Sequence, residues 1–177
     1  MPAAHLVPDT GFDPAALVLA VIVPGLGHMV RHDLWRGGWI CGGVLGLFFG
    51  GILIGGIDVV DSKEETLWFL GEALVGPVAF GVDYIHQKHL KVLDPEQGVL
   101  RSAFPDEGRD PKPPHTPIPG GTPPNTKSIG RVNELGTLFA TIAGMVNLIA
   151  IVDAGFPTRR RTVPAGSVGA GPVSARP

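Results

Sequence analysis

The feature that most constrains this chain is an uncharged run of twenty residues, GWICGGVLGLFFGGILIGGI, which covers residues 38–57 between Arg36 and Asp58. A helix rises about 1.5 Å per residue, so this run spans roughly 30 Å, the hydrocarbon thickness of a bilayer. In water, each glycine inside a helix costs about 1 kcal/mol relative to alanine. Hydrocarbon retains the helix, because an unpaired peptide group there costs several kcal/mol. The run therefore predicts a membrane-spanning helix.

Small residues recur every four positions in this helix, a spacing that places them on one helix face. A second apolar block, residues 133–156, repeats that spacing. Faces of small residues let two helix backbones approach closely in a membrane. We therefore expect the two helices to pack together through these faces. The expected packing residues are Gly38, Gly42, Gly46, Gly50, Gly136, Ala140 and Gly144.

Four apolar blocks in all predict an all-α, polytopic membrane protein, a small bundle of four transmembrane helices. They cover residues 14–30, 38–57, 66–85 and 133–156. The first is short for a full crossing and contains Pro24, which removes a backbone donor and bends a helix. A kinked spanning helix and a re-entrant segment both fit this block, and we favour the kinked helix. With a polar helical extension of the third block, the three-helix membrane region covers residues 14–93.

Three segments outside these blocks lack an apolar pattern. Residues 1–13 are polar, and residues 94–132 form a proline- and glycine-rich linker that we expect to be a disordered loop. Residues 157–177 form a basic tail, which we also expect to be disordered. A cluster of arginines in the tail favours anionic lipid head groups by about 1 kcal/mol per charge. The cluster consists of Arg159, Arg160 and Arg161.

The composition gives no indication of an enzyme. The net charge is −2, so no basic field points to nucleic acid. The single cysteine, Cys41, cannot form an intramolecular disulfide. No G-x-S-x-G, H-E-x-x-H, Walker or C-x-x-C motif is present, and we expect no catalytic residues and no cofactor. The pairs His28/His32 and His86/His89 could each share a helix face, but a metal needs three or four convergent ligands, so we predict no metal site.

Polar side chains within the apolar blocks are the place to look for function, because they are costly in hydrocarbon. The candidates for an intramembrane polar site are His28, Glu72 and Asn147. Glu72 would carry a proton there or pair with a group such as His28. Its alternative role is a hydrogen-bonded acid that holds the third block against its neighbours. Asn147 is similarly a candidate for a hydrogen bond between helices.

Two stretches resemble known membrane segments. The run VPGLGH at residues 23–28, followed by an Arg-Gly-Gly turn and a glycine-rich helix, is similar to the Pro-Gly-x-Gly hairpin of small two-transmembrane-helix domains. Residues 133–154, NELGTLFATIAGMVNLIAIVDA, resemble the closing segment of an uncharacterised family of planctomycete-type bacterial membrane proteins. The resemblance implies a bacterial membrane architecture and no particular reaction.

These observations favour a multi-pass protein of the bacterial inner membrane with no enzymatic activity. The first hypothesis is a scaffold or accessory subunit that packs through glycine and alanine faces, as a homo-oligomer or with a membrane-protein partner. Its support is the abundance of packing motifs. The alternative is a small transporter or channel whose polar path includes Glu72, Asn147 and His28.

Overall fold

A computed structural model of the chain describes residues 5–125, 127–128, 130–156 and 158–163, with side chains between residues 11 and 156. Most of these residues are helical. The helical elements are α1 (Pro14–Ile22), α2 (Leu26–Val30), α3 (Leu34–Gly55), η1 (Ile57–Val59), α4 (Thr66–Glu72), η2 (Ala73–Val75), α5 (Pro77–Ile85), η3 (His86–Leu90) and α6 (Arg131–Gly155). The strands are β1 (His5–Thr10), β2 (Val92–Leu93), β3 (Leu100–Arg101), β4 (Glu107–Arg109), β5 (Pro117–Pro119) and β6 (Thr158–Val163).

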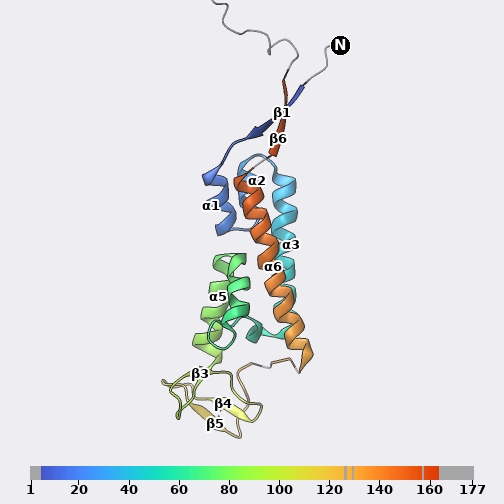
Figure 1. Cartoon of the computed structure of the whole chain (residues 1–177). Coiled ribbons are helices and arrows are strands. Elements are labelled where there is room, and N and C mark those ends of the chain that lie inside the picture. Colours follow the sequence, from blue (N-terminus) through green and yellow to red (C-terminus); the bar gives the residue numbers. More distant parts are fainter. Residues whose placement is uncertain (1–4, 126, 129, 157, 164–177) are drawn as a thin grey trace, which may run out of the picture.

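Two long helices, α3 and α6, run the full height of the helical region side by side (Figure 1). With 22 and 25 residues, both are long and apolar enough to cross a membrane. They are antiparallel, because the start of α3 lies beside the end of α6 and Gly55 lies beside Asn133. The predicted spanning helices over residues 38–57 and 133–156 therefore correspond to α3 and α6. Among the described residues, these two helices and not four meet the requirement for a full crossing.

The contact between α3 and α6 uses small residues, but not the face of α3 that the four-residue spacing predicts. A Cβ on Gly51 would lie 2.6 Å from the carbonyl oxygen of Gly136 and 3.0 Å from the amide nitrogen of Ala140. Gly144 instead packs against the backbone of Gly71. Apart from chain neighbours and the backbone of α3 itself, no atom of the described residues lies within 4 Å of a Cβ placed on the open glycines, which are Gly38, Gly42, Gly46 and Gly50. The pairing of α3 with α6 is therefore predicted correctly, but α3 packs through the face that contains Gly51 and not through the predicted face.

The first apolar block folds back on itself. Its start lies at the end of α6, where the amide of Asp13 donates to the carbonyl of Gly155 at 2.9 Å. Its end lies there too, since the Arg31 guanidinium donates to the carbonyl of Ala154 at 3.3 Å. The prediction of a kinked spanning helix is therefore wrong, and α1 and α2 form a half-length hairpin. Gly25 permits the turn, with φ of 80° and a Cβ position only 2.2 Å from a backbone oxygen of α3.

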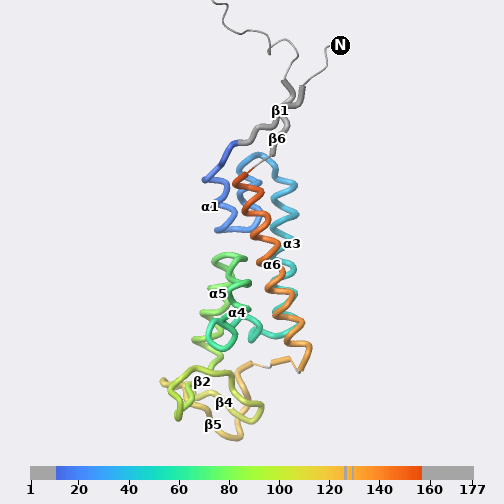
Figure 2. Tube along the Cα trace, in the orientation of Figure 1, coloured from blue at the N-terminus to red at the C-terminus, as the bar shows by residue number. Residues whose placement is uncertain are grey.

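The third block is a second half-length hairpin rather than one continuous helix. Its ends meet where Ser62 donates to Asp83 through both its amide, at 2.9 Å, and its hydroxyl, at 2.7 Å. The chain reverses at Gly76, which has φ of 108° and precedes Pro77 at the start of α5. A Cβ on Gly76 would lie 2.6 Å from the carbonyl oxygen of Val21, so the tips of the two hairpins touch. Figures 1 and 2 show the hairpins stacked end to end beside α3 and α6.

The segment predicted to be a disordered linker is ordered in its described part. Strands β2 and β3 pair, as do β4 and β5, both antiparallel. The Arg101 guanidinium holds the two strand pairs together. Its nitrogens lie 2.7 and 3.0 Å from the carboxylate oxygens of Glu107 and 3.0 Å from Asp94. We call residues 92–119, which contain β2 to β5, the strand unit. Arg109 donates to the carbonyl of Lys91 at 2.9 Å and joins the strand unit to the helices. Such backbone pairing does not need an apolar pattern, so these short strands could not be predicted from hydropathy.

The chain termini are only partly described. Strands β1 and β6 pair antiparallel beyond the end of α6, so residues 158–163 form a strand where a disordered tail is predicted. The side chains of Arg159, Arg160 and Arg161 lie outside the described residues, and so does the tail from residue 164. The predicted contact between these arginines and lipid head groups therefore stays a prediction.

Candidate functional site

Glu72 is the most unusual polar residue of the helical interior. It is the last residue of α4 and lies four residues before the tip of the second hairpin at Gly76. Its side chain is completely buried. Neither carboxylate oxygen has a hydrogen-bond partner among the described residues. A buried, unpaired carboxylate is very costly, so this group is stable only when it holds a proton or a cation.

Asn147 joins α6 to the same hairpin. Its side-chain amide donates to the carbonyl of Leu74 at 2.8 Å, two residues beyond Glu72. Its own carbonyl oxygen has no hydrogen-bond partner among the described residues, and neither does the hydroxyl of Thr141, which lies six residues earlier in α6. Thr141 contacts Gly71 through its methyl group. The stretch of the hairpin that carries Glu72 therefore faces a side of α6 with two unpartnered oxygen atoms.

His28 lies in a different place from the other two predicted site residues. Its Nε2 atom lies 2.7 Å from Asp153, near the end of α6. The guanidinium of Arg36 binds the same carboxylate oxygen at 2.7 Å. The structure thus brings Asn147 to the hairpin of Glu72 and places His28 in a separate ion cluster, which fastens the first hairpin to α3 and α6.

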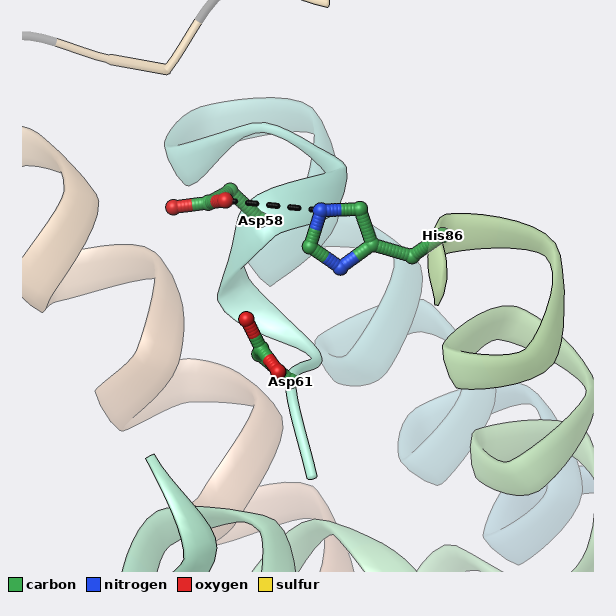
Figure 3. A group of neighbouring side chains, drawn as sticks. All are labelled: Asp58, Asp61 and His86. Carbon is green, nitrogen blue, oxygen red and sulfur yellow. Dashed lines mark ion pairs between the residues drawn. The ribbon is translucent and has the colours of Figure 1, made fainter. Parts of the chain in front are cut away.

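A third polar cluster lies beyond the other end of α3, and we call it the acidic-end cluster. Its centre is His86, whose side chain is completely buried on η3. The ring Nδ1 atom lies 3.2 Å from the carbonyl oxygen of Val60. The ring Nε2 atom lies 3.4 Å from Asp58 Oδ1 (Figure 3). The members of the cluster are Asp58, Asp61, Glu64, His86, Lys91, Ser102 and Lys127.

The carboxylates of the acidic-end cluster are held by several donors. Ser102 donates to Asp58 at 2.5 Å, and the Lys127 ammonium lies 2.6 Å from the other oxygen of Asp58. Asp61 accepts from Gln87 at 2.8 Å and from two backbone amides, and it pairs with the buried ammonium of Lys91. The helices meet the strand unit at this cluster, so the two parts of the molecule are joined by charged contacts.

These contacts decide the charge of the cluster. Burial by itself raises the pKa of Asp58, but the hydrogen bonds from Lys127 and Ser102 hold that pKa well below its ordinary value. Burial also raises the pKa of Asp61, but Lys91 and two backbone amides lower this pKa below its ordinary value. Both groups are therefore carboxylates at neutral pH.

The sequence reasoning missed the acidic-end cluster. In the sequence, Asp58 marks only the end of the apolar run, and His86 is considered only together with His89. In the structure His86 is buried and His89 is exposed. The available signal was Lys91, five residues after His86 in the polar helical extension, but the long-range partners of this lysine could not be predicted from spacing.

Comparison with known proteins identifies the chain's relatives without assigning an activity. Residues 15–163 match a family of unknown function, DUF6677. Because this match covers most of the 177 residues, the chain belongs to that family. No curated protein and no solved structure shows a match to the chain.

Proposed function

We propose that this chain is a multi-pass integral protein of the bacterial inner membrane that moves protons along a polar path containing Glu72. In this proposal α3 and α6 cross the bilayer, and the two hairpins enter it from opposite sides as re-entrant segments. The exposed apolar side chains support a lipid environment. Among the largest, Trp35, Leu53, Leu67 and Ile149 are 70 to 87% exposed. A soluble monomer rarely exposes so many large apolar groups over its surface.

The arrangement of the hairpins supports a transport role. Helices that break within the membrane are tolerated where protein covers the break, and in transporters such breaks form substrate sites near the bilayer midplane. Here the breaks are at Pro24 and at Gly76, and the two tips touch. This places the buried carboxyl of Glu72 within one helical turn of the junction between the tips.

The observation that carries the proposal is the state of Glu72. A carboxyl group that only fastened helices together would have hydrogen-bond partners, because an unsatisfied buried polar group costs about 1–3 kcal/mol. Glu72 has no such partner among the described residues. A group that takes up a proton from one side and releases it to the other needs free oxygen atoms of this kind. Asn147 and Thr141 supply further oxygens beside the same hairpin.

The test is a proton-flux assay on the purified protein in liposomes that contain a pH-sensitive dye. A potassium diffusion potential set with valinomycin drives protons inward. Glu72→Gln keeps the shape of the side chain and removes the exchangeable proton, so we expect the flux to fall to that of protein-free liposomes. Glu134→Gln is the matched control, since Glu134 is exposed at the start of α6. Wild-type flux in Glu72→Gln would refute the proposal.

A second candidate function is a membrane scaffold or accessory subunit that is not an enzyme, assembled as a homo-oligomer. One observation favours it: the open glycines Gly38, Gly42, Gly46 and Gly50 have no neighbour within the described chain. Gly46→Leu should then disrupt a detergent-stable oligomer, as measured by chemical crosslinking. Gly81→Leu is the control, because Gly81 on α5 also has open space around it. An unchanged oligomer in Gly46→Leu would exclude assembly through this face.

A further inference from the structure

We propose that Asp58, Asp61 and His86 bind a divalent transition-metal ion of the zinc class at the end of α3. One ligand atom from each of these residues can be chosen so that all three lie within 4.8 Å of one another. All three side chains are almost completely buried. The residues come from two segments that are far apart in the sequence, η1 with the turn after it and η3, and Figure 3 shows them converging. This site does not include Glu72 and does not depend on the proposed transport activity.

The imidazole of His86 is set up as a metal ligand. Its Nδ1 atom lies 3.2 Å from the carbonyl oxygen of Val60, which can only accept, so the ring proton resides on Nδ1. This leaves the lone pair of Nε2 directed at Asp58. A backbone carbonyl on the second ring nitrogen is the usual way in which proteins orient a metal-binding histidine.

The Nε2 atom has no hydrogen-bond partner among the described residues, although it is completely buried. It faces Asp58 Oδ1 at 3.4 Å. Two acceptor atoms in this position repel unless a cation lies between them. The cation is either a second ring proton or a metal ion. Asp61 adds a second carboxylate whose ligand atom lies within 4.8 Å of those of Asp58 and His86, so the three groups can share one metal ion.

The charges of the cluster also favour a metal ion. The three carboxylates of Asp58, Asp61 and Glu64 face two ammonium groups, which leaves one excess negative charge with His86 neutral. Lys91 is completely buried and bridges Asp61 and Glu64, so it stays in place. Lys127 is about half exposed and can return its ammonium to water. A divalent ion in place of the Lys127 ammonium makes the cluster neutral.

The ligand types define the class of metal. One imidazole nitrogen with two carboxylates suits zinc and neighbouring first-row ions better than calcium or magnesium, which prefer oxygen ligands alone. Three protein ligands would leave a fourth position for water or for the hydroxyl of Ser102, which already lies 2.5 Å from Asp58. Bound there, the ion would join the end of α3 to η3 and to the strand unit.

The experiment is isothermal titration of zinc chloride into the full-length, detergent-purified protein after chelator treatment and dialysis. We expect one ion per chain and a rise in the thermal unfolding temperature, because an ion that binds only the folded state stabilises it. His86→Ala should lower the affinity at least tenfold. The matched control is His89→Ala, which removes an exposed histidine three residues further on and should leave the affinity unchanged.

Two further variants keep the result decisive if His86→Ala does not fold. Asp58→Asn preserves the shape of the side chain and should weaken zinc binding at least tenfold. Lys127→Met removes the competing ammonium and should strengthen zinc binding. The proposal is overturned if the wild type binds no zinc, which would leave the proton as the cation between His86 and Asp58. It is also overturned if Asp58→Asn binds as well as the wild type, or if His89→Ala loses as much affinity as His86→Ala.

Discussion

Two alanine substitutions on α3 distinguish the packed face of this helix from its open face. At Gly51, a Cβ would lie 2.6 Å from the backbone oxygen of Gly136 and 3.0 Å from the backbone nitrogen of Ala140. Both atoms belong to the backbone, so no side-chain rotation can relieve the contact. The two helices must separate by several tenths of an ångström, and overpacking of this kind costs about 1–3 kcal/mol. Gly51→Ala should therefore destabilise the protein by about that amount.

Gly46→Ala is the matched substitution five residues earlier in the same helix. Apart from chain neighbours and the backbone of α3 itself, no atom of the described residues lies within 4 Å of a Cβ on Gly46. Replacing a mid-helix glycine by alanine gains about 1 kcal/mol of helix propensity, so stability should stay constant or rise. The assay is unfolding in mixed detergent and dodecyl sulfate micelles, followed by circular dichroism. A larger loss in Gly46→Ala than in Gly51→Ala would refute the assignment of the packed face and restore the spacing-based prediction.

Three other changes test separate parts of the structure. In a cysteine-free background, His32→Cys and Glu96→Cys should react with a membrane-impermeant thiol reagent from opposite sides of the membrane, whereas four crossings would place both on one side. Lys91→Met leaves Asp61 as an unpaired buried charge and should lower the free energy of unfolding in detergent by about 3–5 kcal/mol. A decrease below about 1 kcal/mol would show that the ion pair is solvated. Asn147→Leu removes the donor to the carbonyl of Leu74 at the tip of the second hairpin. This change should lower the free energy of unfolding by about 1–3 kcal/mol in the same assay. Unchanged stability would count against that hydrogen bond.

The parts of the fold that could be predicted from the sequence are those fixed by local chemistry. The length and hydropathy of residues 38–57 and 133–156 are sufficient to predict two long helices, and α3 and α6 occupy these positions. The start of α1 is also fixed locally, because Asp13 precedes Pro14 and its carboxylate accepts from the amide of Ala16 at 3.0 Å. These features depend on residues close together in the chain.

The parts that could not be predicted depend on contacts between distant residues. Pro24 and Gly76 signal a break in a helix, but a break leads equally to a kink or to a reversal. The choice depends on whether Gly25 packs against the backbone of α3 and whether Gly76 packs against the backbone of Val21. The spacing of residues in the sequence predicts neither contact. In the same way, the four-residue spacing of small residues on α3 is real, although the described chain packs on the adjacent stripe that contains Gly51.

The two hairpins and the two long helices have matching arrangements that run in opposite directions. Each half is a broken, half-length hairpin paired with a long helix, and the long helices α3 and α6 run in opposite directions. A hairpin that stops midway leaves backbone groups at its tip without partners, and hydrocarbon cannot supply them. Here the carbonyl of Leu74 is satisfied by Asn147, and the tip at Gly76 closes against Val21. Each hairpin therefore needs the rest of the bundle to cover its end.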